Sequence, residues 1–333
     1  MGAGTPPRSF AEVVVALGGQ MLYGFSRMSS APHLFRRFAV RGVFWREYLD
    51  WALRHVPFYL QPILLVWMTV FFFFFAASVR RALVSNFALI LPGSSPFWNH
   101  LRAFHTLLNF AWTITDGAKY KLTKCEFRYE IEGAEFLDQL AAAPGAIVLT
   151  AHMGNYDLGA AIFARKFERE IRMVRAPEPD RETEQHLQAG LNQAGAGGVK
   201  VDYNTGGALL SFDLLNAIRG GAIVSIQGDR AMAGVVNETG PLFGRSVPLP
   251  SGPFSLALAA QVPIFPLFIV RTGYRRYRIV ACAPIQVRRT QNTRREEIVS
   301  GLTAWRRVLE NVVKKYPAQW FAFVPLLRAN AKS

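Results

Sequence analysis

The chain has 333 residues, of which 51% are hydrophobic and 18% charged, and its formal net charge is +15. This composition excludes an intrinsically disordered chain, and the two distant cysteines, Cys125 and Cys282, indicate neither a disulfide framework nor a zinc cluster. The positive charge suits a nucleic acid, an anionic membrane surface or an acidic partner. We favour the membrane over nucleic acid, because no zinc-finger, RNP or KH pattern is present and a long apolar segment lies among arginines.

The first part of the chain predicts helices at a membrane. Helical periodicity with basic faces over residues 10–27 and 44–55 indicates interfacial helices. Residues 56–79 carry no charge and include five consecutive phenylalanines. As one helix they would reach roughly 36 Å, enough to cross a bilayer or to lie embedded along its edge. We predict a membrane segment at about 56–79; a helix buried in the protein core is the alternative.

Beyond a Pro/Gly/Ser cluster at 91–96, helical spacing predicts one more helix over about 101–115. From about residue 126 the pattern changes to short apolar runs that alternate with amphipathic helices. The predicted strands are 146–151, 171–176, 199–203, 222–227, 262–270 and 277–283, and the predicted helices are 157–167, 180–193, 206–219, 251–260 and 295–316. This alternation predicts an α/β fold with a mixed sheet covered by helices. We expect a helical region over residues 1–95 and an α/β domain over 96–333.

The most informative stretch is the hexapeptide from His152 to Asp157, which follows the apolar run 146–151. A buried strand that ends in histidine and turns through Gly154 and Asn155 into a helix can bring an imidazole to a carboxylate. We therefore predict that His152 is a general base and that Asp157 orients it. The alternative is a structural histidine at a strand end, with Asp157 as an acid in the first turn of the helix.

A second polar cluster, from Gln227 to Arg230, follows the apolar run 222–226. A guanidinium beside a glycine at a strand end can bind a phosphate or a developing oxyanion, and Arg175 at the end of another strand could reach the same edge. A surface Asp–Arg pair and a solvated arginine are the alternatives. Because ligands of open α/β sheets bind at the carboxyl ends of strands, the position of both clusters favours a site there.

A third candidate is Ser251, which precedes a helix of small apolar residues. Its side chain can cap this helix, and the free amides of the first turn suit an anion or a carbonyl oxygen; capping alone is the alternative. No GxSxG elbow, Walker loop, dinucleotide fingerprint or HExxH motif is present, which argues against the corresponding enzyme classes. The predicted substrate-binding residues are Gly154, Asn155, Arg175, Asp229, Arg230 and Ser251.

Together these motifs resemble the bacterial lipid A biosynthesis (lauroyl/myristoyl) acyltransferases, relatives of the wider glycerolipid acyltransferases with an HxxxxD motif. The resemblance covers about residues 51–325 and depends on the order of its parts. These are the apolar segment with Arg80, Arg81 and 86–92, then 150–157, 228–230, 243–244 with 248–252, 263–271 and finally 316–321.

The resemblance implies transfer of a fatty acyl group from an acyl carrier protein or coenzyme A thioester to a hydroxyl of a membrane lipid. His152 would be the base and Asp157 its orienting acid, while Arg175 or Arg230 would stabilise the tetrahedral state. The family implies no metal, no cofactor and no covalent enzyme intermediate. It places the protein at the cytoplasmic face of the bacterial inner membrane.

Two departures from the family pattern leave the acceptor open. The lipid A enzymes usually have Glu where this chain has Asp157, and their aromatic and basic ending is replaced here by residues 321–327. The acceptor is therefore a lysolipid or a glycolipid that need not be a lipid A precursor. The alternatives are an N-acyltransferase that makes an aminolipid and a non-catalytic lipid-binding protein on the same scaffold.

Overall fold

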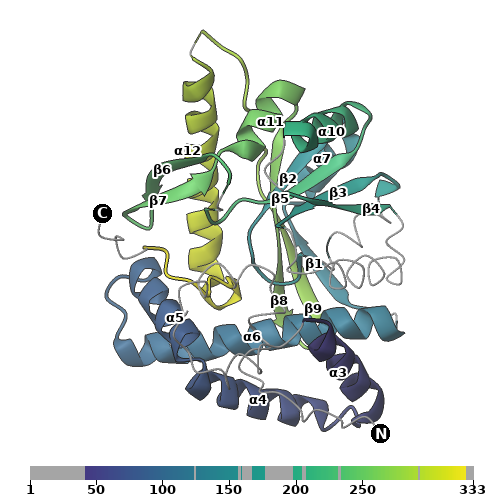
Figure 1. The fold of residues 1–333 in the computed structure, drawn as a ribbon, viewed down its shortest axis with the longest axis vertical. Coiled ribbons are helices and arrows are strands. Elements are labelled where there is room, and N and C mark those ends of the chain that lie inside the picture. The colour runs from purple at the N-terminus through teal and green to yellow at the C-terminus, as the bar shows by residue number, and fades with distance from the viewer. Residues whose placement is uncertain are drawn as a thin grey trace, which may run out of the picture.

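The computed structural model describes residues 42–123, 125–156, 159, 167–176, 198–204, 208–231, 234–291 and 293–327. The predicted helices over 10–27 and 180–193 lie outside these residues, as does most of the predicted helix over 157–167. The described chain forms an α/β fold in which one large sheet is covered by helices (Figure 1).

The described part of the chain contains a seven-stranded mixed sheet in the order β1-β9-β8-β2-β5-β3-β4. Neighbouring strands are parallel, except that β8 and β9 are antiparallel. The mixed sheet predicted from the sequence is confirmed. The strands are β1 (Arg128–Glu132), β2 (Ala146–Thr150), β3 (Ile171–Arg175), β4 (Val199–Tyr203), β5 (Ile223–Gln227), β8 (Ile264–Gly273) and β9 (Arg276–Ala281).

The central strand β2 is buried on both faces, as its unbroken apolar sequence predicts. Ala146 and Val148 pack into one hydrophobic cluster together with α7 (Ala134–Ala142). Ile147 and Leu149 pack into a second cluster together with α10 (Ala208–Arg219), α11 (Gly252–Ala260) and α12 (Arg294–Lys315). The sheet therefore has a separate apolar core on each face.

The segment from residue 237 to 250 forms a hairpin of β6 (Asn237–Leu242) and β7 (Arg245–Pro250). The strands predicted from the sequence do not include this segment. The reason is its prolines, which are excluded from central strands but tolerated in an isolated two-stranded ribbon. Arg306 of α12 holds the hairpin in place by donating to the carbonyl oxygens of Glu238, Gly240 and Val247.

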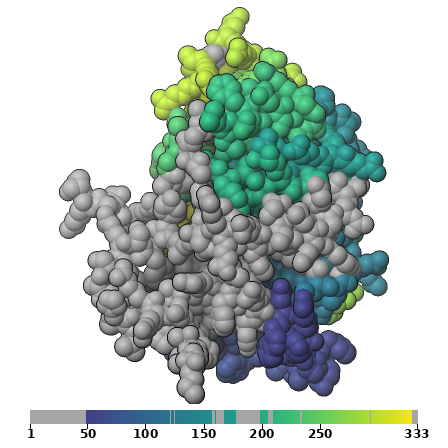
Figure 2. Space-filling model, turned by 45° about the vertical axis from the view of Figure 1, so that its right-hand side comes forward, coloured from purple at the N-terminus to yellow at the C-terminus, as the bar shows by residue number. Residues whose placement is uncertain are grey.

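Four helices lie together at one end of the molecule, away from α10 and α11 (Figure 1). They are α3 (Gly42–His55), α4 (Gln61–Phe75), α5 (Ala77–Ile90) and α6 (Pro96–Thr123), and we call them the helical base. In the space-filling view the purple residues of this base lie below the green residues that include α10 (Figure 2).

The predicted apolar segment over 56–79 does not form one helix. No single helix in the described ranges is both long and apolar enough to cross a membrane. The pair α4 and α5 passes that test only jointly, and the two helices are bent by 88° at a break between them. The break is at Ala76, whose φ and ψ of −88° and 60° are not helical. Alanine favours helix, so the amino-acid sequence of this segment gives no sign of the break.

The C-terminal segment returns to the helical base and ends beside the sheet. Asn86 of α5 donates to the carbonyl oxygens of Ala322 and Val324 and accepts from the backbone N–H of Leu326. Asn109 of α6 donates to the carbonyl oxygen of Ala318. These contacts hold residues 318–326 where they can touch the ends of the central strands.

Candidate active site

The strands β2 and β5 bring two candidate residues to the same edge of the sheet. They are parallel neighbours, with Thr150 opposite Gln227, and the backbone N–H of Gly228 donates to Thr150 O at 2.9 Å. Parallel strands end at the same edge, so the residues that follow them meet. These residues are His152, two positions after β2, and Asp229, two positions after β5.

His152 and Asp229 form a buried hydrogen-bonded pair. Nδ1 of His152 lies 2.7 Å from Oδ1 of Asp229, and the two side chains are 11% and 1% exposed. Trp320 donates its indole N–H to the other carboxylate oxygen, Oδ2, at 2.7 Å. Nη2 of Arg230 lies 3.8 Å from the same oxygen. Both oxygens of Asp229 are thereby fixed, and so is the plane of the imidazole.

The surroundings of this pair favour a neutral imidazole beside an ionised carboxylate. Burial, followed by the charge of Arg230, holds the pKa of His152 below its ordinary value. Burial raises the pKa of Asp229, but the pair with His152, the charge of Arg230 and the Trp320 hydrogen bond outweigh burial and lower it. An ionised carboxylate only accepts, so Nδ1 carries the hydrogen. Nε2 keeps its lone pair, and it has no hydrogen-bond partner among the described residues.

The lowered pKa of His152 predicts a pH profile for a reaction in which it is the base. A base must be unprotonated, so kcat/KM should fall on the acid side at the pKa of His152 in the free enzyme. We expect the midpoint of this fall below pH 6.5, the unperturbed value for histidine. Initial rates between pH 5 and 8 measure it. A midpoint at or above 6.5 would contradict the buried environment described here.

The loop that carries His152 is held from two sides. The backbone N–H of Phe321 donates to His152 O at 2.8 Å, and that of Gly154 donates to Gln319 O at 3.1 Å. From the other side, the backbone N–H of Asn155 donates to Ile269 O of β8 at 3.0 Å. The loop is therefore held by hydrogen bonds between the C-terminal segment and β8.

Gly154 is the residue in this loop that another side chain cannot replace. Its φ is +54°, and a Cβ at this position would lie 1.7 Å from the carbonyl oxygen of Ile269. We expect Gly154→Ala to lower the free energy of unfolding by at least about 2 kcal/mol, because backbone must move and the left-handed conformation is strained. Thermal unfolding in detergent measures this.

The matched control for Gly154→Ala is Gly117→Ala in α6, where a Cβ would meet nothing within 4 Å. Alanine is the better helix former, so this control should be neutral or stabilising. Equal loss of stability in the two variants would contradict the tight contact between Gly154 and β8.

Asn155, whose role in binding substrate stays a prediction, belongs to a buried polar network. Its amide nitrogen donates to Thr113 O of α6 at 3.3 Å and contacts Tyr277 Oη of β9 at 3.5 Å. Tyr277 in turn donates to Asp116 of α6 at 2.6 Å. Burial raises the pKa of Tyr277 far above its usual range. These contacts tie the histidine loop to the helical base.

The remaining predicted residues lie at the same edge in different settings. Arg230 donates to Phe321 O at 3.3 Å. Arg175 is the last residue of β3, and its positive charge also lowers the pKa of His152. The capping prediction for Ser251 is wrong. Its backbone is helical, at φ −89° and ψ −10°, rather than extended as capping requires, and its hydroxyl donates to Val236 O.

The predicted partner of His152, Asp157, lies outside the described residues, so its orienting role stays a prediction. Asp229 is among the predicted substrate-binding residues, and its contact with His152 is not predicted from the sequence. Trp320 has no predicted role, although the motif that contains it is part of the resemblance. The signal for Asp229 was present in the sequence, since both polar clusters follow apolar strands of one sheet.

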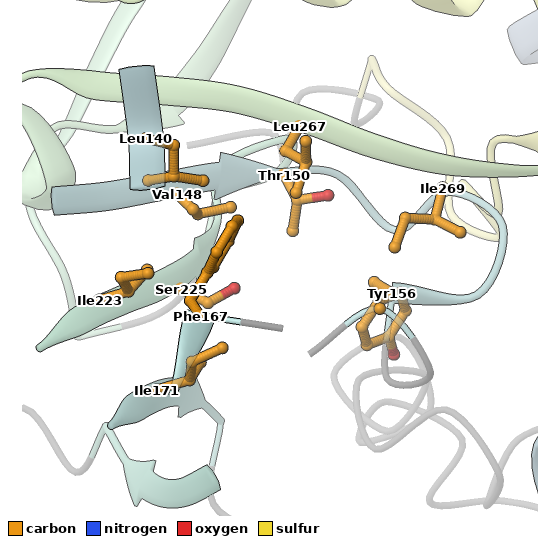
Figure 3. Close-up of a pocket in the computed structure, with 11 residues that line it drawn as sticks. Leu140, Val148, Thr150, Tyr156, Phe167, Ile171, Ile223, Ser225, Leu267 and Ile269 are labelled. Carbon is orange, nitrogen blue, oxygen red and sulfur yellow. The ribbon is translucent and has the colours of Figure 1, made fainter. Parts of the chain in front are cut away.

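Two pockets border the central strands, one on each face of the sheet. On the α7 side, a small pocket of about 30 Å³ lies between β2, β3, β5 and β8 (Figure 3). Thr150 and Tyr156 line it near the end of β2, and Leu140 and Ile223 lie on the side away from Tyr156 (Figure 3). A larger cavity, of about 420 Å³, lies on the other face between α10 and α11.

A helix-covered mixed sheet with a buried histidine–carboxylate pair at its strand ends describes an α/β protein with the parts of a general-base enzyme. The family model of the bacterial lipid A biosynthesis acyltransferases matches residues 42–329. The chain belongs to this family and is an acyltransferase, as the resemblance implied. No curated protein sequence matches it.

Proposed function

We propose that the protein transfers a fatty acyl group from an acyl carrier protein or coenzyme A thioester to a hydroxyl of a lysolipid or lipid A-like glycolipid. The observation that carries this proposal is the buried pair of His152 and Asp229 in a chain of an acyltransferase family. A neutral imidazole whose Nε2 has no hydrogen-bond partner among the described residues has the form that a base for a hydroxyl requires.

In the proposed reaction the acceptor hydroxyl gives its proton to Nε2 of His152 while its oxygen attacks the thioester carbonyl carbon. Asp229 accepts from Nδ1 throughout and stabilises the imidazolium that forms. The tetrahedral intermediate then collapses, the C–S bond breaks, and the imidazolium returns the proton to the leaving sulfur. The products are an ester and a free thiol, and His152 is again neutral.

Negative charge develops on the former carbonyl oxygen, and a guanidinium near His152 would stabilise it. Arg230 and Arg175 are the candidates, because the charges of both act on His152. Arg230 is anchored by Phe321 O, which limits its movement. The family resemblance implies the orienting role for Asp157; in this proposal Asp229 fills that role at Nδ1, and Asp157 is a further acidic residue nearby in the sequence.

The acceptor would reach the site from a lipid bilayer that contacts the helical base. Family members are typically associated with membranes. The helix α4 presents a row of large exposed apolar side chains, including Ile63 (66%), Trp67 (62%), Phe74 (66%) and Phe75 (66%). Monomeric soluble proteins rarely expose such contiguous apolar patches. Because α4 has 15 residues, about 22 Å, we propose that it lies in the membrane surface.

The charge of the helical base agrees with an anionic membrane. Between Asp50 and Asp116 the sequence contains no acidic residue, whereas it contains four arginines: Arg54, Arg80, Arg81 and Arg102. Basic residues beside an apolar face attract anionic head groups, and the overall charge of +15 also suits an acidic carrier protein. We propose the cytoplasmic face of the bacterial inner membrane as the location.

Membrane binding through α4 can be tested by placing a charge on its exposed face. Trp67→Glu should weaken binding of the whole protein to phosphatidylethanolamine–phosphatidylglycerol vesicles by at least about tenfold, since burying one large apolar side chain contributes roughly 1.5–3 kcal/mol. Co-sedimentation measures it. Val299→Glu, on the exposed face of α12, is the matched control and should bind normally. Equal binding by both variants would contradict docking through α4.

The proposed reaction is tested with a radiolabelled lauroyl thioester and a panel of lysolipids and glycolipids in detergent. A labelled ester product supports O-acylation and names the acceptor. A labelled amide product would replace the proposal by N-acylation. Lipid binding without turnover of any thioester would replace it by the non-catalytic alternative.

A further inference from the structure

The larger cavity, on the α10 and α11 face of the sheet, has one apolar wall and one polar wall. Its apolar wall comes mainly from the two helices, through Leu210, Leu214, Leu256 and Ala259. Its polar wall comes from strand ends: Arg175 ends β3, Gln227 ends β5, and Asn204 follows β4. A volume of about 420 Å³ lies within the range of about 300–1,000 Å³ that is typical of ligand sites. The lining suits a ligand with an apolar tail and a polar head.

The polar wall contains an amide that lacks a partner. Nε2 of Gln227 is buried, and no described group accepts a hydrogen bond from it. A buried donor without an acceptor costs about 1–3 kcal/mol, so native proteins rarely keep one without a reason. A carbonyl oxygen of a bound ligand would satisfy it.

The position of Gln227 connects this cavity to the proposed base. Gln227 precedes Asp229 by two residues, and Asp229 holds His152. On its other side, the His152 loop contacts α6 through Asn155, and α6 belongs to the helical base. The His152–Asp229 pair is therefore linked through the chain to Gln227 in the cavity wall, and through Asn155 to the helical base.

Resting on the proposed function, we propose that this cavity binds the fatty acyl chain of the thioester donor and sets the chain length that the enzyme prefers. Gln227 donates to the carbonyl oxygen near the mouth, and the chain extends between α10 and α11. The pocket on the α7 face, at about 30 Å³, is much smaller than this cavity and lies well below the volume that is typical of ligand sites (Figure 3). The cavity lining contains no acidic residue among those described, which suits an electron-rich head group.

The test changes the depth of the cavity in both directions. Ala259→Phe adds volume to the apolar wall and should move the preferred acyl chain to a shorter length. Leu210→Ala removes volume and should move it to a longer one. Each buried methylene contributes about 0.8 kcal/mol, so two displaced methylenes should change the ratio of kcat/KM values for long and short donors roughly 15-fold. The donors are acyl-coenzyme A thioesters of 8 to 16 carbons.

Asn216→Phe is the control, because this residue is exposed on α10 and does not line the cavity. Its chain-length profile should match the wild type. Opposite shifts in Ala259→Phe and Leu210→Ala support the assignment. An unchanged profile in both, with wild-type transfer intact, would overturn it while leaving the proposed reaction in place. Absence of wild-type transfer from every donor would instead contradict the proposed function.

Discussion

His152→Ala is expected to lower the rate of acyl transfer by about 10²–10⁴-fold, the usual contribution of a general base. The variant loses the atom that takes the proton of the acceptor hydroxyl, while Asp229 keeps its contacts with Trp320 and Arg230. We therefore expect it to fold and to bind lipid vesicles. Single-turnover transfer of a radiolabelled acyl chain measures the loss, and circular dichroism checks the fold.

The matched control for this variant is His100→Ala. His100 is an exposed residue of α6, and its ring contacts only the carbonyl oxygen of Pro96 among the described hydrogen bonds. Its removal should change the transfer rate by less than about twofold, since exposed substitutions away from a site have small effects. Full activity in His152→Ala would remove His152 from the reaction.

Asp229→Asn is expected to lower the transfer rate by at least about 10²-fold, through the tautomer of His152. Trp320 donates to one oxygen of Asp229, so the oxygen of the new amide must face Trp320. The amide NH₂ group then faces Nδ1 of His152 and donates to it. This moves the imidazole hydrogen to Nε2, which can no longer accept a proton from the acceptor hydroxyl.

A second substitution tests this explanation. In the double variant Asp229→Asn, Trp320→Phe the indole N–H is gone, so the amide can turn and accept from Nδ1. Part of the lost activity should return relative to Asp229→Asn alone. The control is Asp138→Asn on the exposed side of α7, which should transfer at the wild-type rate. Wild-type activity in Asp229→Asn would show that the carboxylate does not orient His152.

The sequence was sufficient to predict the strands that build the site. The runs that contain β2, β3 and β5 are short and apolar and end in polar residues, so both the sheet and the edge where ligands bind could be inferred. The six strands predicted from about residue 146 onward are present. The division of the chain at residue 95 stays a prediction.

Contacts between distant residues could not be predicted in the same way. Local spacing predicts Asp157, which lies outside the described residues, but it gives no sign of Asp229, whose carboxylate lies at Nδ1 of His152 from 77 residues away. Trp320 reaches Asp229 across 91 residues because α12 and the C-terminal segment fold back onto the sheet. Such pairs depend on strand order, and strand order is set by the packing of the whole domain.

The elements that the sequence analysis missed have local causes. The strand β1 has charged residues at every second position, since it lies at the edge of the sheet, and this masks its apolar character. The bend between α4 and α5 occurs at an alanine and depends on contacts rather than on a helix-breaking residue. Arg80 of α5 donates back across this bend to Phe74 O at 3.1 Å.

The central claim is that His152 is neutral at physiological pH, carries its hydrogen on Nδ1 and offers a free Nε2. Nitrogen-15 NMR of histidine-labelled protein in detergent tests this directly, with His152→Ala used to assign the resonance. We predict a protonated Nδ1 and an unprotonated Nε2 at pH 7, with titration below pH 6.5. A hydrogen on Nε2 at pH 7, or a doubly protonated ring, would contradict the proposed base.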